Sequence, residues 1–145
     1  MKFEQDLQDG REAEIYVLDI IRRKYPLAFI IDGCHKAYDI FIPERDYGVE
    51  VKNDRQSQIT GNAFIEVECN GIESGIITTR ANIWVYCVKN NCYWCETQQI
   101  RKMIIQNNLR FFEDKPKGET SVVCAYIVEL DLLERYSIKR TTRTQ

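Results

Sequence analysis

Residues 37–53 have the sequence AYDIFIPERDYGVEVKN, and this stretch decides the fold that we expect. Two β-like segments flank the polar residues 43–46, which is typical of a β-hairpin with a four-residue loop. In the simplest register Ile42 pairs with Tyr47, so that the numbers of paired residues sum to 89. Because side chains alternate along a strand, this register fixes which residues of the hairpin share a face.

Three charged side chains of this hairpin are expected on one face. Asp39 lies directly opposite Glu50 in the predicted register, with Cβ atoms about 4.5–5.5 Å apart. Lys52 lies two residues beyond Glu50 and therefore points to the same side. Like charges that face each other destabilise a sheet. We therefore expect a cation to compensate for this acid pair, beyond what Lys52 can provide.

A hard divalent cation fits these ligands. Mg²⁺ and Mn²⁺ prefer carboxylate, carbonyl and water oxygens, so Asp39, Glu50 and the Val51 carbonyl are candidate ligands of an open site. An open metal site beside Lys52 suits hydrolysis of a phosphodiester. The metal would make hydroxide available, and the ammonium would position or deprotonate the water and add positive charge.

A helix is expected before the hairpin, over residues 9–25. Asp9 and Glu12 have the spacing of a capping box, and Pro26 follows the last turn. Glu14 lies on or beside the apolar stripe and needs a partner, because an unpaired buried charge is costly. We predict that it supplies a third carboxylate near the metal, although a solvated position at the rim of the stripe is the alternative. The stripe consists of Ala13, Val17, Leu18 and Ile21.

The rest of the chain predicts a single α/β domain over residues 1–145, with a central mixed sheet flanked by helices. Residues 90–91, both Asn, predict a hairpin turn, and residues 111–120 predict a charged loop. Further strands are expected at residues 27–31, 63–69, 83–89, 92–96 and 122–130, and helices at residues 97–107 and 131–136.

Composition excludes several classes of protein. No apolar run approaches the roughly 18 residues of a membrane span, and the polar start does not resemble a signal peptide, so we expect a cytoplasmic protein. The net charge of −2 excludes a uniformly basic nucleic-acid binder. Cys92 and Cys95 form a CxxC motif, but on one strand they would point to opposite faces. This argues against a structural zinc site.

The arrangement of acids and lysine resembles the PD-(D/E)XK nuclease superfamily, which has the restriction-endonuclease-like fold. Glu14 matches the helix glutamate of that family, Asp39 the motif aspartate, and Glu50-Val51-Lys52 the (Asp/Glu)-x-Lys motif. Tyr38 stands where the family often has proline. The resemblance covers roughly residues 10–105.

This resemblance implies a restriction-endonuclease-like core and a Mg²⁺- or Mn²⁺-dependent deoxyribonuclease. The catalytic residues would be Glu14, Asp39, Glu50 and Lys52. The small size and the Gly-x-x-x-Glu helix resemble archaeal Holliday-junction resolvases and small phage or viral nucleases. That likeness implies a homodimer, a junction-like DNA substrate and a viral or prokaryotic source, with the host cytoplasm as location for a virus.

Other readings of the same residues remain open. One is a catalytically silent nuclease-fold module that binds DNA or protein, and another is an assembly protein whose acid pair holds a cation. Asn82 departs from the aspartate that phage-type members often have near this position. Glu66 and Glu68 lie on the polar face of the strand at residues 63–69, where solvation is the simplest explanation.

Candidate DNA contacts follow the hairpin, because backbone-directed contacts need hydrogen-bond donors and positive charge near the site. Lys36 and Arg80 are additional candidates, and the aromatic residues Trp84, Tyr86, Tyr93 and Trp94 are expected to pack in the sheet or at a dimer face. The polar residues after the hairpin that we predict to contact DNA are Asn53, Arg55, Gln56, Gln58, Thr60 and Asn62.

Overall fold

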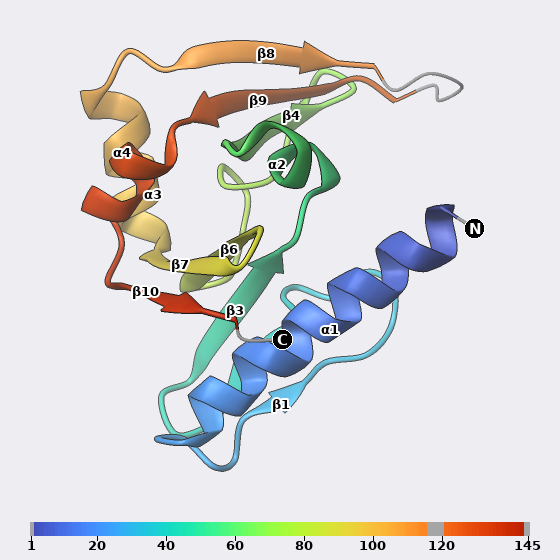
Figure 1. Cartoon of the computed structure of the whole chain (residues 1–145), viewed down its shortest axis with the longest axis vertical. Helices are drawn as coiled ribbons and strands as arrows, with labels where there is room; N and C mark the ends of the chain where they lie inside the picture. The colour runs from blue at the N-terminus through green and yellow to red at the C-terminus, as the bar shows by residue number, and fades with distance from the viewer. Residues whose placement is uncertain (1, 116–120, 144–145) are drawn as a thin grey trace.

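The computed structural model describes residues 2–115 and 121–143, and it is a mixed α/β fold (Figure 1). The predicted mixed sheet with flanking helices is present. The strands nevertheless divide between two sheets within the described residues, whereas the sequence predicted one. Among the same residues, no helix is long and apolar enough to cross a bilayer.

The larger sheet contains the predicted hairpin and has the strand order β1-β2-β3-β6-β7-β10. Its strands pair antiparallel except for β3 and β6, which pair parallel after a long crossover. The sheet is therefore mixed, as expected. Its strands are β1 (Phe29–Ile30), β2 (Ile40–Ile42), β3 (Tyr47–Lys52), β6 (Ile83–Val88), β7 (Asn91–Glu96) and β10 (Lys139–Thr142).

The smaller sheet is antiparallel, has the order β5-β4-β9-β8, and lies at the other end of the molecule from α1 (Figure 1). The expected loop over residues 111–120 is wrong up to residue 114, because these residues pair with β9, and residues 116–120 lie outside the described part of the chain. Its strands are β4 (Ala63–Cys69), β5 (Ile72–Glu73), β8 (Arg110–Asp114) and β9 (Val123–Val128).

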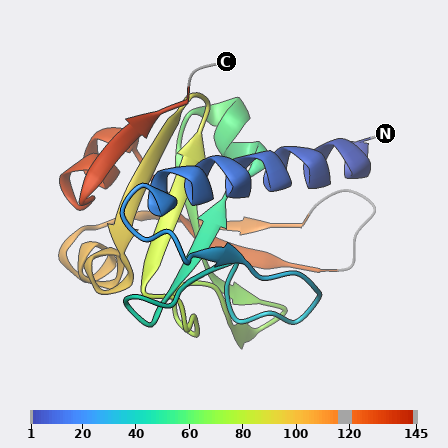
Figure 2. The same ribbon diagram turned by 90° about the horizontal axis from the view of Figure 1, so that it is seen from below.

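The longest helix, α1 (Lys2–Arg22), lies across one face of the larger sheet (Figure 2). The predicted start at Asp9 is wrong. Asp9 lies inside the helix, where its carboxylate accepts a hydrogen bond of 2.8 Å from Gln5. This side-chain bond between residues four apart supports the additional turns. The shorter helices are α2 (Arg55–Thr60), α3 (Thr97–Gln106) and α4 (Leu130–Arg135).

The two faces of the larger sheet border two apolar cores. Val85 and Cys92 lie in the core beneath α1, and Tyr86 and Cys95 lie in the core toward the smaller sheet. Cys92 and Cys95 therefore point to opposite faces, as predicted. The hairpin turn between β6 and β7 is one residue earlier than predicted, and Lys89 adopts its left-handed conformation with φ of 55°.

The predicted register of the first hairpin is confirmed. Ile40 pairs with Val49 and Ile42 pairs with Tyr47, so the paired numbers sum to 89. A Cβ atom on Gly48 would lie 2.3 Å from the ring of Tyr38, so glycine lets this ring lie directly against the strand. The regular pairing ends at Ile40 and Val49, and beyond it Asp39 stays beside β3 through hydrogen bonds to Val49 and Val51.

Candidate active site

Asp39 is the most firmly positioned of the predicted site residues. It lies immediately before β2, is 7% exposed, and its main chain donates to Val49 and accepts from Ile31. One carboxylate oxygen, Oδ2, accepts the backbone N–H of Val51 at 2.8 Å. Side chain and main chain are thus both fixed against the neighbouring strands. This burial and hydrogen bonding hold the carboxylate in one orientation beside Glu50.

Lys36 joins Asp39 to the helix glutamate. Its Nζ lies 3.0 Å from Oδ1 of Asp39 and 3.6 Å from Oε1 of Glu14. Arg11 lies 3.5 Å from Oε2 of Glu14, one turn earlier on α1, and also pairs with Asp32. Glu14 is therefore not a solvated rim residue, because its side chain is only 15% exposed and faces the hairpin.

Glu50 and Lys52 lie on one face of β3, as the register predicts. The carboxylate of Glu50 is 3.5 Å from the ammonium of Lys52, and that ammonium lies 5.3 Å above the ring of Trp84. Trp84 is the β6 neighbour of Glu50 in the parallel pairing. The strand crossover therefore supplies the aromatic surface beneath Lys52.

The environment of the site raises the pKa of two of its carboxyl groups. Burial, and then the charge of Asp39, raise the pKa of Glu50 from 4.5 to about 7, although Lys52 opposes this shift. Burial and Asp39 also raise the pKa of Glu14, despite the nearby Lys36 and Arg11. Additional positive charge in this site would stabilise the ionised carboxylates.

Lys52 is a permanent cation in this environment. Burial by itself would lower its pKa, but the surrounding carboxylates, Glu50 first and Asp54 next, raise it above the ordinary value. Lys52 is therefore an ammonium at neutral pH. It can attract a phosphate or stabilise negative charge, and it is poorly suited to take a proton from water.

The donor chemistry of the site fits a hard divalent cation. Glu14, Asp39 and Glu50 offer carboxylate oxygens of the kind that Mg²⁺ and Mn²⁺ prefer. The raised pKa values of Glu14 and Glu50, and the Lys36 ammonium between Glu14 and Asp39, indicate that the site favours positive charge. The described residues contain no group of three or more His, Cys, Asp or Glu already arranged to hold a metal.

The predicted DNA contacts do not share one environment. Gln58 is used within the protein, because its side chain bonds Asn53, the Cys87 carbonyl and the Lys89 N–H. Arg55 is exposed at the start of α2. The hydroxyl of Thr60 donates to the Gln56 carbonyl and accepts from the Asn62 N–H. These hydrogen bonds lie within α2 and at its C-terminal end.

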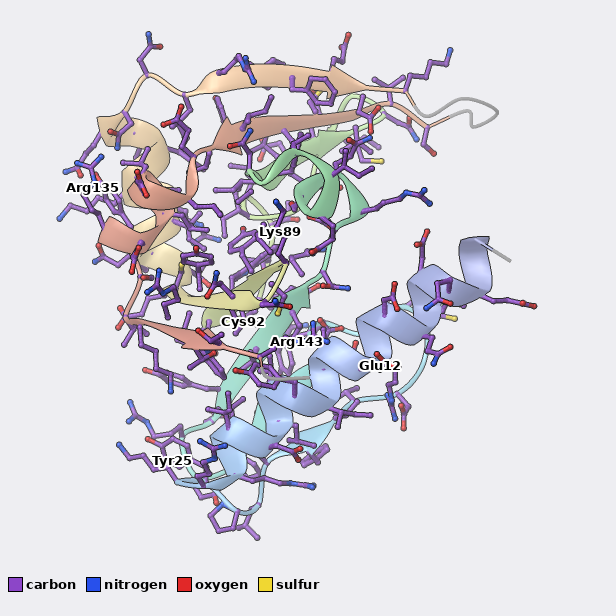
Figure 3. All side chains as sticks on the ribbon, in the orientation of Figure 1. Glu12, Tyr25, Lys89, Cys92, Arg135 and Arg143 are labelled. Atoms are coloured by element: carbon purple, nitrogen blue, oxygen red, sulfur yellow. The ribbon has the colours of Figure 1, made fainter. Side chains whose placement is uncertain are left out.

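A polar cleft of about 560 Å³ lies where β3 ends, between α1 and the β6–β7 turn. Asn53 and Gln58 line it together with two basic residues, Lys89 and Arg143. Glu12 borders it from α1. Figure 3 labels three of these side chains, Glu12, Lys89 and Arg143. Lys89 comes from the β6–β7 turn and was not among the predicted contacts, whereas Arg143 directly follows β10 in the basic tail, which the sequence suggests as a phosphate contact.

Asn82 has a structural position. Its side-chain oxygen accepts the N–H of Gly48, and its own N–H donates to the Gly48 carbonyl, at 2.9 and 2.8 Å. Its carbonyl accepts the N–H of Thr97. Asn82 therefore ties the start of β3 to the crossover and to α3. The other residues left open are Glu66, which accepts a hydrogen bond from Ser74, and Glu68, opposite Cys124.

Comparisons of the chain with family models, with curated proteins and with solved structures found no match.

Proposed function

We propose that the chain is a metal-dependent deoxyribonuclease with a restriction-endonuclease-like core. One observation carries the proposal. Helix α1 and the hairpin together carry three carboxylates, those of Glu14, Asp39 and Glu50, and Lys52 lies two residues beyond Glu50 on the same face of β3. This spacing resembles that of the PD-(D/E)XK superfamily. The order of elements adds support, because a helix, three antiparallel strands and a crossover to a parallel strand form the expected core.

Each residue has a distinct task in this proposal. Asp39 and Glu50, with the Val51 carbonyl, would hold Mg²⁺ or Mn²⁺, and Glu14 would bind a water of the metal or a second ion. The bound metal supplies a nucleophilic hydroxide at neutral pH and neutralises charge on the reacting phosphate. Lys52, a fixed ammonium, attracts the phosphate and stabilises the charge that develops on its oxygens.

The position of the Lys36 ammonium would differ between this proposal and the alternative. In the structure its ammonium lies against Glu14 and Asp39, where a metal ligand set would form. In a nuclease, Glu14 and Asp39 would hold a divalent ion in place of this ammonium, and Lys36 would be free to contact the phosphate. In a catalytically silent DNA- or protein-binding module, which is the second candidate, Lys36 stays in place permanently and completes a structural ion-pair network.

A cleavage assay tests the proposal. Labelled four-way junction, duplex, flap and single-stranded DNA are incubated with protein in Mg²⁺, Mn²⁺ or EDTA. We expect metal-dependent cleavage that Glu50→Gln abolishes and that the matched control Glu96→Gln, at the exposed end of β7, retains. The same assay tests which DNA substrate is preferred. Sizing of the protein in solution tests the proposed homodimer.

Two results would contradict the proposal. Cleavage that survives in Asp39→Asn/Glu50→Gln would place the activity elsewhere or in a contaminant. Salt-sensitive DNA binding without cleavage in any metal would support the silent binding module, because phosphate contacts alone give binding of that kind.

A further inference from the structure

A second cleft lies beside Lys52, between β3 with α2 and the smaller sheet. It has a volume of about 240 Å³. Lys52 and Asp54 border it on one side, and Phe64, Glu66 and Phe112 border it from β4 and β8. In Figure 1, α2 lies between the larger sheet and strands β4 and β9, which agrees with this position. The cleft therefore opens directly next to the proposed catalytic lysine.

The pairing of the smaller sheet explains why the cleft exists. Glu66 and Phe112 both lie opposite Ala125, so the three residues form one row across β4, β9 and β8. Residues in such a row share a face of the sheet. The short side chain of Ala125 lies between two longer ones and leaves the middle of the row hollow. Phe64 closes one end, in an edge contact of 5.8 Å with Phe112.

Two polar groups of this cleft lack partners among the described residues. The carboxylate of Asp54 makes no hydrogen bond or ion pair there, although burial raises its pKa. The indole N–H of Trp84, a residue that is 3% exposed, likewise has no acceptor. Buried polar groups without partners are uncommon in folded proteins. The Asp54 carboxylate, on a partly exposed residue that borders the cleft, is thus an acceptor open to a ligand, whereas the Trp84 N–H is itself shielded from solvent.

We propose that this cleft binds a single unstacked nucleobase that carries an exocyclic amino group, next to the phosphate that the enzyme cleaves. The proposal rests on the proposed nuclease function and adds the substrate class to it. Adenine, cytosine and guanine carry an amino group for the carboxylates of Asp54 and Glu66, whereas thymine does not. Each base also offers a flat face for Phe112.

The size of the cleft limits the ligand. Its volume of about 240 Å³ is below the roughly 300–1,000 Å³ of sites for drug-sized molecules, so it admits one base and excludes a base pair. A base reaches such a cleft only after leaving the stack, which costs least at an end, a flap or a junction. The cleft therefore favours DNA with an unpaired nucleotide over intact duplex.

Binding experiments without cleavage test this inference separately from the nuclease activity. Labelled duplexes with a one-nucleotide overhang of cytosine, thymine or an abasic residue are titrated by fluorescence anisotropy, in EDTA and in Ca²⁺. We expect cytosine to bind about 5- to 150-fold more tightly than the abasic overhang, the range for loss of one base–aromatic stack. Thymine is expected to bind between the two, because it stacks without donating an amino hydrogen.

Three variants assign the preference to the cleft. Phe112→Ala removes the advantage of both bases over the abasic overhang. The matched control Phe111→Ala keeps it, because Phe111 lies on the opposite face of β8, is 54% exposed and packs on Tyr126. Asp54→Leu has a similar shape but no hydrogen-bond acceptor, so it reduces the preference for cytosine over thymine and leaves the stacking advantage of both bases. This variant still tests the inference if Phe112→Ala fails to fold.

The outcomes distinguish this inference from the function on which it rests. Equal affinity for all three overhangs, or absence of binding in both EDTA and Ca²⁺, overturns the inference. A preference that appears only with a divalent ion also overturns it, since the carboxylates of the cleft would then bind a cation. Cleavage without base preference contradicts the inference alone. Base preference without cleavage in any metal supports the cleft and contradicts the nuclease proposal.

Discussion

The ammonium nitrogen of Lys36 lies 3.0 Å from Oδ1 of Asp39 and holds a positive charge between two carboxylates of the candidate site. The other carboxylate, that of Glu14, belongs to α1, so this one side chain connects the helix to the hairpin. In the absence of a metal, Lys36 is the main compensation for the repulsion between these acids. Glu14 and Asp39 would hold a divalent ion in the place that this ammonium occupies.

Lys36→Met should therefore make stability depend more on metal. We expect a loss of about 1–3 kcal/mol in the free energy of unfolding in EDTA, because two partly buried carboxylates lose a charged partner. Mg²⁺ or Mn²⁺ should raise Tm more in this variant than in the wild type. Thermal denaturation with and without metal measures both effects. Lys102→Met, an exposed change on α3, is the control, and equal metal shifts in all three proteins would contradict the prediction.

The pKa of Glu50 predicts a pH dependence of stability. The folded state raises this pKa from 4.5 to about 7, so the folded protein binds the proton more tightly than the unfolded chain does. The contribution of Glu50 to stability is therefore greatest at low pH, falls as the pH rises from about 4.5 to 7, and is constant above that window. The full change is about 3 kcal/mol.

Glu50→Gln should remove this contribution. In EDTA we expect the variant to be more stable than the wild type at pH 8, by up to about 3 kcal/mol, and the difference should vanish near pH 4. Urea denaturation across this pH range measures it, with Glu96→Gln as the matched control for the change of charge. A difference that does not vary with pH would show that Glu50 does not titrate in this window.

The sequence predicted the hairpin register because two periodic rules agree there. Strand alternation and a four-residue loop together allow one pairing in which Ile40 and Ile42 both lie in the core. The division into two sheets was not predictable in this way. Whether β4 pairs with β3 or with β9 depends on contacts between distant segments, and the alternation in β4 is the same in both arrangements. The sequence did not predict β8, because the charges of Glu113 and Asp114 made this segment resemble a loop. An edge strand such as β8 tolerates these charges.

The site was predictable where its residues lie on regular elements. Glu50 and Lys52 follow strand alternation in β3, Asp39 directly precedes β2, and Glu14 follows helix periodicity. Lys36 was expected only as a DNA contact, because it lies in an irregular segment. His35, with φ of 57°, turns the chain just before it, and no periodic rule gives the direction of the next side chain.

Two glycines should respond oppositely to alanine. Gly48→Ala should destabilise the protein by about 1–3 kcal/mol, because the added Cβ would meet the ring of Tyr38 at 2.3 Å. Gly10→Ala should stabilise it by about 1 kcal/mol, because Gly10 lies inside α1, where nothing lies within 4 Å of the new methyl group. Chemical denaturation of both variants gives the two values. Stabilisation by Gly48→Ala would contradict the close packing of Tyr38 on β3.

The salt dependence of DNA binding should identify Arg55 as a phosphate contact. Arg55 is exposed at the start of α2, borders the proposed base cleft, and pairs with no carboxylate among the described residues. If it binds one phosphate, Arg55→Ala should weaken binding of all sequences alike and reduce the slope of log affinity against log salt by about 1. Arg110→Ala is the control, because Arg110 is also exposed but lies in a cleft away from Lys52. Anisotropy titrations at several salt concentrations give the slopes. Identical slopes for the wild type and Arg55→Ala would remove this arginine from the binding surface, whereas a changed slope for Arg110→Ala would show that the DNA also follows the smaller sheet.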